Sequence, residues 1–373
     1  MNLQKLIKQN IDIIKNVRRE LHENAELAFN EHKTQKIILD FLNKLGIDTQ
    51  ICAKTGVVAT INKGEACIGI RADMDALPIN GVSHVCGHDF HMAVVLGAAM
   101  ILKEIGYNKC IKFIFQPAEE GEGGALPMIN EGVLKNPEVK AMVGFHVWPG
   151  VSVGKIEVTK GASMASADDF RIKFKGVGGH AAMPHICKNP IYPVIDFIET
   201  INIKSRIEQN PLNSHIVTVS AINGGSVPNA IAEEVEVMGT VRTFDNELRK
   251  KLRDDIEKVA RLSAEKYNCE VEIDYRWQYP PLISNANLTE LFIETTKSVM
   301  GKENVLPLEK TFAAEDFSFF AEKVPSVHFR LGISDCKLGL HPLHSPEFDA
   351  SEEAILYGVY AICNFIISMY NEY

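Results

Sequence analysis

Two short segments of the chain carry side chains that could hold a metal ion and activate a water. The first is Cys86-Gly87-His88, which offers a thiol and an imidazole two residues apart. These ligands suit zinc or another borderline divalent cation. If the segment is extended, both side chains point the same way and Gly87 leaves room for an ion. A Cys-x-His pair alone is weak evidence, because a buried thiol beside a surface histidine has the same spacing.

The second segment is Glu119-Glu120, which follows an apolar, strand-like run and Pro117. Adjacent side chains of a regular strand point to opposite faces. Both can therefore enter one site only where the backbone turns, and Pro117 supplies that break. One carboxylate could then hold a metal while the other takes a proton from water. A solvated acidic loop is the alternative interpretation.

Further side chains extend this inventory. His146 sits in an apolar run, where a core histidine is the ordinary interpretation, and His344 lies in a loop-like segment. Asp73 follows another strand-like run and is a candidate for orienting a ligand or binding substrate. Five side chains are candidate metal ligands, enough for two ions that share a water: Cys86, His88, Glu120, His146 and His344.

The elements that must position these residues alternate between strands and helices. Leu3–Glu23 has apolar residues at helical spacing, Thr34 looks like the N-cap of a second helix, and His91–Ile105 is a third. The candidate carboxylates and His146 follow or end strand-like runs. This order predicts an α/β fold with a mixed, mainly parallel sheet flanked by helices, where ligands gather outside the carboxyl ends of the strands.

From about residue 166 the pattern changes to the βαββαβ order of a ferredoxin-like domain. We therefore expect a catalytic domain in two parts, 1–165 and 278–373, with an inserted domain at 166–277. The glycine-rich segment 176–185 lacks the Lys-Ser/Thr ending of a P-loop, and we expect it to present His180. Asn229 and Arg242 are further polar candidates, since arginine is a natural partner for a carboxylate. Turn and strand-edge structure is the alternative for both.

The composition excludes some classes of protein. The chain has 373 residues and a net charge of −9. With no long Lys/Arg run, this charge argues against nucleic-acid binding. No stretch of about 18 apolar residues predicts a membrane span. The first residues show no signal-peptide core and the eight cysteines are scattered, so we expect reduced thiols in a cytoplasmic protein.

Seven motifs make the chain similar to a known family over essentially its whole length. It resembles the di-metal amidohydrolases of the aminoacylase/carboxypeptidase peptidase superfamily. The most similar branch holds hippurate hydrolases, N-acetyldiaminopimelate deacetylases and indole-acetyl-amino-acid hydrolases. In chain order, the matching segments are Arg18-Arg19-Glu20-Leu21-His22, Arg71-Ala72-Asp73-Met74-Asp75-Ala76-Leu77-Pro78, Cys86-Gly87-His88-Asp89, Gln116-Pro117-Ala118-Glu119-Glu120-Gly121, Gly178-Gly179-His180-Ala181-Ala182, Gly239-Thr240-Val241-Arg242 and Glu315-Asp316-Phe317.

The resemblance implies a phosphorylase/hydrolase-like zinc-exopeptidase catalytic domain. It also implies that His180 belongs to a lid domain that helps bind substrate and pairs subunits into a homodimer. Between Pro78 and His84 the chain is shorter than the usual family pattern, so the resemblance says less about substrate choice than about metal chemistry. It further implies a general base at Glu119 and metal ligands at Cys86, His88, Glu120, His146 and His344.

The resulting hypothesis is a metal-dependent amidohydrolase that cleaves N-acyl-L-amino acids, hippurate-like or N-acetylated, with N-acetyldiaminopimelate as one candidate. Two divalent ions per subunit (zinc, manganese, cobalt or nickel) would acidify a water. Glu119 would take its proton and return it to the leaving amine, and His180 would stabilise the tetrahedral oxyanion after lid closure. One alternative is a metallo-dipeptidase or carboxypeptidase that uses the same site. Another is a metal-dependent binding module without turnover, which would have no need of the Glu119-Glu120 pair.

Overall fold

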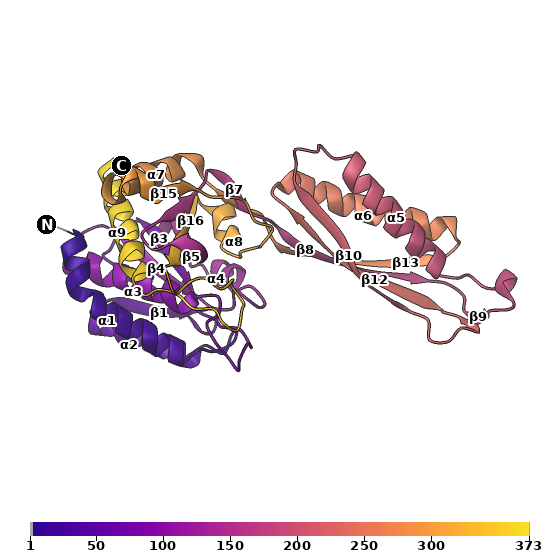
Figure 1. Ribbon diagram of the computed structural model, residues 1–373, viewed down its shortest axis with the longest axis horizontal. Coiled ribbons are helices and arrows are strands. Elements are labelled where there is room, and N and C mark those ends of the chain that lie inside the picture. Colours follow the sequence, from indigo (N-terminus) through magenta and orange to yellow (C-terminus); the bar gives the residue numbers. More distant parts are fainter. Residues whose placement is uncertain (1–2, 373) are drawn as a thin grey trace. The chain divides into compact units, whose positions relative to one another are not determined.

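The structure is a computed structural model that describes residues 3–372. Its internal contacts divide the chain into two compact units, whose elements are labelled in Figure 1. The first unit comprises Met1–Gly161, Ile283–Glu309 and Asp316–Tyr373. The second comprises Ala162–Leu282 and Lys310–Glu315.

The first unit is built on an eight-stranded sheet with the order β1-β2-β4-β3-β5-β16-β6-β15. Its central strands β4, β3, β5 and β16 are parallel, whereas β2 runs antiparallel to β4 and β6 antiparallel to β16. The predicted mixed, mainly parallel sheet is therefore confirmed. The strands are β1 Asp48–Cys52, β2 Gly56–Ile61, β3 Ala66–Asp73, β4 Ile111–Gln116, β5 Glu138–Ser152, β6 Ile156–Val158, β15 Val305–Pro307 and β16 Ser326–Ser334.

Helices flank this sheet because its central strands are apolar on both faces and must be covered. The helix α3 packs against α1, α9 and β3. It is buried along nearly its whole length, which explains why its sequence is apolar on all sides. The helices are α1 Leu3–Glu23, α2 His32–Lys44, α3 His88–Glu104, α4 Ala125–Asn130, α7 Ala286–Met300, α8 Ser318–Lys323 and α9 Ala354–Glu372, with a short 3-10 helix at Lys302–Asn304.

Two expectations about helix starts are wrong. Thr34 is not an N-cap, because α2 already begins at His32. The carboxylate of Glu26 accepts the N–H groups of Lys33 and Thr34, at 2.7 and 3.1 Å, in place of a capping side chain. The helix α3 begins at His88, three residues before the predicted start.

The segment Cys86-Gly87-His88 is also not extended. Gly87 is the N-cap of α3 and has a φ of +82°, a left-handed conformation that glycine adopts most readily. A Cβ at this position would lie 2.4 Å from a methyl carbon of Val147. Glycine is therefore required here by both conformation and space, and His88 becomes the first residue of a helix.

The second unit is a four-stranded antiparallel sheet with the order β10-β12-β8-β13. In chain order its main elements form the predicted βαββαβ arrangement. The helices α5 and α6 pack beside each other, and alternate residues of β8 and β12 form the core beneath them. The elements are β8 Ala167–Lys175, α5 Ile191–Ile207, β10 His215–Gly224, β12 Glu234–Thr243, α6 Asn246–Lys266 and β13 Glu270–Tyr279, with a 3-10 helix at Pro184–Ile186.

Two short ribbons complete the structure. The strands β9 (Gly179–His180) and β11 (Ala230–Ile231) pair with each other, as do β7 (Gly161–Met164) and β14 (Leu282–Ser284). All eight cysteines are free thiols. Within residues 3–372, no helix has both the length and the apolar character needed to cross a membrane.

Candidate metal centre

The candidate ligands of the first unit meet near the carboxyl ends of its parallel strands. The strand β3 ends at Asp73, and β4 ends at Gln116 and leads into the turn that carries Glu119. His146 lies on β5, and α3 begins at His88. This is the edge at which open α/β sheets bind their ligands.

Cys86 lies at the middle of the cluster. Its Sγ is 3.4 Å from Nε2 of His146 and 3.3 Å from Nε2 of His344. Nε2 of His344 is 3.0 Å from Oε1 of Glu120, and Nε2 of His88 is 3.9 Å from the same oxygen. The structure thus brings together all five side chains that the sequence suggested as ligands.

The hydrogen bonds of two histidines leave one ring nitrogen of each facing the cluster. Nδ1 of His88 lies 2.9 Å from the carbonyl oxygen of Asp75, and Nδ1 of His146 lies 2.7 Å from that of Val147. A carbonyl can only accept, so Nδ1 carries a proton in both rings, and Nε2 is the nitrogen that can bind a metal once it holds no proton. Among the described residues, the buried Nε2 of His88 has no hydrogen-bond partner. Such a nitrogen is suited to a metal ion.

His91 is also close, but both of its ring nitrogens are used within the protein. Nδ1 lies 2.5 Å from Oδ1 of Asp73, and Nε2 accepts the N–H of Val147 at 2.9 Å. Asp73 is fully buried and its other oxygen accepts from Nη1 of Arg71 at 2.7 Å. The carboxylate of Asp73 therefore orients neighbouring side chains and has no exposed surface with which to meet a substrate.

Arg71 extends this buried network across the sheet. Its Nη2 donates to Asp316 at 2.7 Å, and its Nε donates to the side-chain oxygen of Gln116 at 3.0 Å. Gln116 in turn donates to Asp316. All three side chains are fully buried, so these bonds join the ends of β3 and β4 to the segment that precedes α8.

The carboxylates give the cluster a negative field. Burial alone would lower the pKa of His88, but the charge of Asp73 and its neighbours outweighs this effect and raises the pKa to about 10. Burial raises the pKa of the Cys86 thiol well above its ordinary value, and Glu120 and Glu119 raise it further. Burial also acts to raise the pKa of Glu120, but the nearby histidines hold it below its ordinary value. A cation is therefore favoured here, whether it is a proton or a metal ion.

The donor set fits a divalent metal of the borderline class. A thiol, three imidazoles and a carboxylate are the ligands of zinc and its neighbours in the first transition row. In three overlapping groups of residues, each residue offers one ligand atom, and these atoms all lie within 4.8 Å of one another. The groups are Cys86, His88 and His146; Cys86, Glu120 and His344; and His88, Glu119 and Glu120.

The two adjacent glutamates enter one site because the backbone turns before them, as Pro117 suggested. Ala118 has a φ of +56°, which breaks the alternation of the strand. The carboxylate of Asp75 accepts the N–H groups of Glu119 and Glu120, both at 2.9 Å. Sequence reasoning gave Asp75 no separate role, and the signals for it were its place in the motif of residues 71–78 and its position two residues after Asp73.

Asp89 has a supporting position beside the cluster. It is fully buried, and its Oδ2 lies 2.8 Å from Nη2 of Arg18 and 2.8 Å from Nδ1 of His22. The guanidinium of Arg18 also lies over the ring of Phe90, 4.3 Å from its centroid. These contacts give the Arg18–His22 motif a structural purpose, which is to fix the start of α3.

Three predicted residues belong to the second unit. His180 is exposed on the β9–β11 ribbon, and its Nδ1 accepts the N–H of Ala182 at 3.1 Å. The carbonyl oxygen of Asn229 accepts the N–H of Ala181 at 3.0 Å, so Asn229 lies beside His180. Arg242 lies instead on β12, opposite Ile216 of β10. The second unit thus brings two of the three together.

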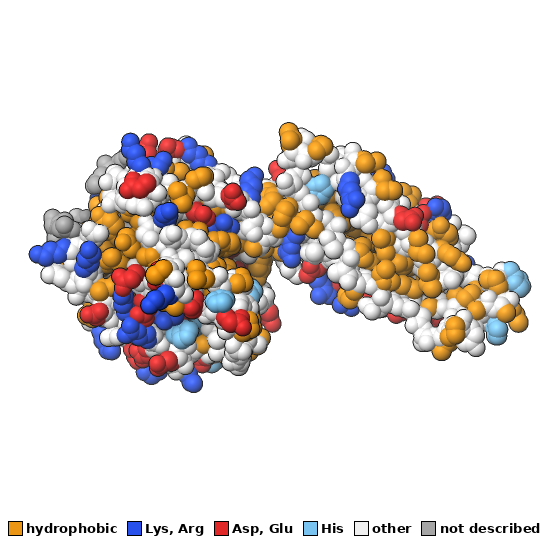
Figure 2. Space-filling view, in the orientation of Figure 1, with side chains coloured by type: hydrophobic (Ala, Val, Ile, Leu, Met, Phe, Trp, Pro, Cys, Tyr) orange, Lys and Arg blue, Asp and Glu red, His pale blue; other side chains and the backbone are white. Residues whose placement is uncertain are grey.

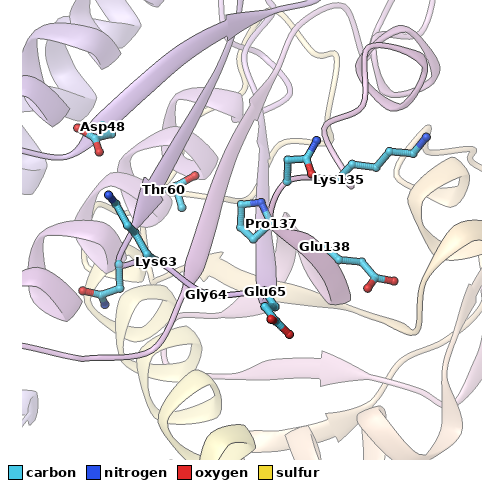
Figure 3. Close-up of a pocket in the computed structure, with 10 residues that line it drawn as sticks. Asp48, Thr60, Lys63, Gly64, Glu65, Lys135, Pro137 and Glu138 are labelled. Atoms are coloured by element: carbon cyan, nitrogen blue, oxygen red, sulfur yellow. The ribbon is translucent and has the colours of Figure 1, made fainter.

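A separate surface pocket of about 830 Å³ lies at the opposite ends of the same strands (Figure 3). Glu65 directly precedes β3 and Glu138 begins β5, so the pocket is at the amino ends of these strands. Its lining mixes Lys63 and Lys135 with carboxylates. None of the candidate metal ligands lines it, so the pocket is not part of the site.

Known proteins similar to this chain include three relatives of comparable length. A family model for "Peptidase family M20/M25/M40" matches residues 69–368. The chain is 35% identical to an N-acetyldiaminopimelate deacetylase of Bacillus cytotoxicus, over 87% of this chain and 90% of the relative. It is 35% identical to IAA-amino acid hydrolase ILR1-like 2 of Arabidopsis thaliana, over 92% and 82%. It is 33% identical to thermostable carboxypeptidase 2 of Saccharolobus solfataricus, over 98% of each.

Two solved structures match this chain over nearly its whole length. The chain matches a putative aminohydrolase of methicillin-resistant Staphylococcus aureus with a TM-score of 0.94 and 29% identity, over 99% of this chain and 100% of the other. It matches the YXEP protein of Bacillus subtilis, described as a dinuclear metal-binding peptidase, with a TM-score of 0.83 and 31% identity, over 97% and 99%.

Proposed function

Because the chain belongs to peptidase family M20/M25/M40 and is a metal-dependent amidohydrolase, we propose that it cleaves the amide bond of N-acyl-L-amino acids. The observation that carries this proposal is the turn that places Glu119 and Glu120 side by side beside Cys86 and His88. A base next to a group of metal ligands is what hydrolysis of an unactivated amide requires.

We propose that the cluster holds two divalent ions per subunit, drawn from zinc, manganese, cobalt and nickel. The Nε2 atoms of His88 and His146, which face the cluster, support this, as does the dinuclear description of the Bacillus subtilis relative. When bound, such ions lower the pKa of a coordinated water from about 16 to about 7. The proposed ligands are Cys86, His88, Glu120, His146 and His344.

Proton transfer is carried out by a side chain of the protein, Glu119. Glu119 is only 8% exposed, so its carboxylate can exchange a proton with the reacting groups away from bulk water. It takes a proton from the attacking water and returns it to the leaving amine. His180 donates to the oxygen of the tetrahedral intermediate, and Arg242 and Asn229 bind polar groups of the substrate.

Two relatives indicate which acyl groups and amino acids to test first. One is named for N-acetyldiaminopimelate and the other for IAA-amino acids. Free N-acetyl-, N-benzoyl- and N-indole-acetyl-L-amino acids are therefore the first substrates to test, each with protein loaded with one of the four metals. The carboxypeptidase relative favours peptides as a second class. Faster hydrolysis of unblocked dipeptides than of any acyl amino acid would establish that alternative.

Substitution of Glu119 by Gln tests the assignment of the base. We expect kcat to fall by about 10²- to 10⁴-fold, while the metal content measured by plasma emission spectrometry stays that of the wild type. Full turnover by a metal-loaded Glu119→Gln protein would reject the proposal. Ligand binding without hydrolysis of any acyl amino acid or peptide by the wild type would favour a binding module.

We also propose a homodimer formed through the second unit. The outer face of α5 carries exposed apolar residues at four-residue spacing, with Glu199 between them: Ile191, Ile195, Ile203 and Ile207. Figure 2 shows hydrophobic side chains gathered over this unit. Such a face is typical of a protein interface. Sedimentation of an Ile195→Glu, Ile203→Glu protein should give a monomer, and a wild type that sediments as a monomer would contradict the proposal.

The eight free thiols support a reducing compartment, and we propose the cytoplasm.

A further inference from the structure

Three consecutive backbone N–H groups of the turn that carries the proposed base all point at buried carboxylates. The N–H of Ala118 donates to Oε1 of Glu31 at 3.0 Å. The next two, of Glu119 and Glu120, donate to Oδ1 and Oδ2 of Asp75, both at 2.9 Å. The turn that places both glutamates in the site is therefore held by two carboxylates from outside it.

The side chain of Glu31 is itself fixed in place by burial and by a second hydrogen bond. Its side chain has no exposed surface, and its second oxygen, Oε2, accepts from the hydroxyl of Thr55 at 2.5 Å. Burial of a carboxylate without partners is strongly unfavourable, whereas hydrogen bonds to a charged acceptor are shorter and stronger than neutral ones. Glu31 is also the N-cap residue of α2, yet its side chain makes no capping bond. Its side chain therefore accepts a hydrogen bond from the turn and none from the first residues of the helix.

The turn needs such support. Ala118 has a φ of +56°, and a non-glycine residue in this region costs on the order of 1–3 kcal/mol unless its surroundings enforce it. If Ala118 relaxed to an ordinary extended conformation, the next two side chains would point to opposite faces. Either Glu119 or Glu120 would then leave the cluster.

Asp75 joins this turn to the other side of the site. Its backbone carbonyl accepts from Nδ1 of His88 at 2.9 Å, while its side chain holds the two amides. One residue thus sets both the ring orientation of a proposed ligand and the backbone that carries the proposed base.

We propose that Glu31 and Asp75 are positioning residues that form a carboxylate clamp on the Ala118–Glu120 turn. The clamp directs Glu120 to the metal ions and Glu119 to the reacting water. This inference rests on the roles of Glu119 and Glu120 in the proposed function. Glu31 touches neither substrate nor metal in this scheme, and its effect is on geometry alone.

The same segment offers a matched control. Glu26 lies five residues before Glu31, and its carboxylate also accepts backbone N–H groups, those of Lys33 and Thr34 at the start of α2. Substitution of Glu26 by Ala removes a structural hydrogen-bond acceptor from this segment without touching the turn. Substitution of Glu31 by Ala removes the acceptor of the Ala118 N–H.

The test compares these variants as cobalt-loaded proteins, with the N-acyl amino acid that the wild type hydrolyses fastest as substrate. For Glu31→Ala we expect kcat to fall by about 10- to 100-fold, the range found when residues that orient metal ligands are substituted. KM should stay within about threefold, and the visible absorption of bound cobalt should change because Glu120 is displaced. Glu31→Gln keeps an oxygen that can accept from Ala118 and should recover most of kcat.

Glu26→Ala should lower the thermal midpoint but leave kcat and the cobalt spectrum as in the wild type. The clamp is overturned if Glu31→Ala has the kcat and spectrum of Glu26→Ala. If Glu31→Ala does not fold, Thr55→Val decides, since it removes the donor that fixes Oε2 of Glu31. We then expect kcat to fall by about threefold or more, and a wild-type kcat overturns the clamp.

Glu119→Gln separates this inference from the proposed function. If Glu119→Gln keeps full turnover, the proposed base is wrong and the clamp fails with it. If Glu119→Gln is inactive while Glu31→Ala and Thr55→Val turn over like the wild type, only the clamp is wrong.

Discussion

Metal binding by this protein should be strongly dependent on pH, because the ions must displace protons from at least two ligands. In the metal-free chain, neighbouring carboxylates overcome the effect of burial and raise the pKa of His88 to about 10. Burial first, and then Glu120, raise the pKa of Cys86 well above its ordinary value. Both groups are therefore protonated at neutral pH, and both must lose their protons before they can coordinate a metal.

The size of the effect follows from this count. Each displaced proton changes the apparent association constant tenfold per pH unit, so two protons give about a hundredfold, or about 2.7 kcal/mol, per unit. As pH rises, competition by protons weakens and affinity increases. Between pH 6.5 and 7.5 we therefore expect zinc to bind about a hundredfold more tightly. Cys86→Ala should reduce this gain to about tenfold.

Titration calorimetry in two buffers with different ionisation enthalpies gives the number of protons released. The wild type should release about two protons or more, and Cys86→Ala about one fewer than the wild type. Cys363→Ala is the matched control, since Cys363 is another fully buried thiol whose pKa is raised by burial, but it lies in α9. The reasoning is refuted if the wild type releases fewer than one proton, or if Cys86→Ala releases as many as the wild type.

Three further predictions concern stability, and urea unfolding of chelator-treated protein checks the first two. Arg18→Met leaves the buried Asp89 without the guanidinium at 2.8 Å, so we expect a loss of about 3–5 kcal/mol at pH 7. Burial acts to raise the pKa of Asp89, but Arg18 and the neighbouring histidines hold it far below its ordinary value. The wild-type advantage should therefore be full above about pH 4 and shrink as the pH falls below that; an advantage that grew in acid would contradict this. Lys112→Met removes three bonds from Nζ to backbone carbonyls, at 2.8, 2.9 and 3.0 Å, and should cost about 2 kcal/mol or more with kcat unchanged. Gly239→Ala would place a Cβ 2.2 Å from the ring of Phe170, so calorimetry should show the second unit destabilised by about 1–3 kcal/mol, and an unchanged melting temperature would disprove the clash.

The sequence was most informative where structure depends on short-range pattern. The helix Leu3–Glu23 and the βαββαβ order follow from the spacing of apolar residues, and both match the structure. The candidate ligands could be chosen by residue type, since thiols, imidazoles and carboxylates are the side chains that bind zinc and similar ions. Pro117 predicted a break in the strand before the two glutamates, and the structure has one at Ala118.

What could not be predicted depends on contacts between distant segments. Glu31 binds the backbone of Ala118 across 87 positions of sequence, and Arg71 binds Asp316 across 245. No local pattern marks a buried carboxylate whose partner is a backbone N–H elsewhere in the chain. The predicted start of α3 is three residues too late for a related reason. The helix begins after Gly87, whose left-handed conformation and close approach to Val147 depend on the fold. The ring roles of His88 and His91 likewise depend on hydrogen-bond partners that only the fold supplies.

The contact between Cys86 and His344 has a consequence for how the chain is tied together. These residues are 258 positions apart, and the main segment of the second unit lies within the loop that they close. An ion bound by both acts as a reversible cross-link of that loop. For a permanent link of this length, the chain-entropy model gives a stabilisation of roughly 5 kcal/mol. A bound metal would therefore hold the two halves of the first unit together even while the unit inserted between them unfolds and refolds.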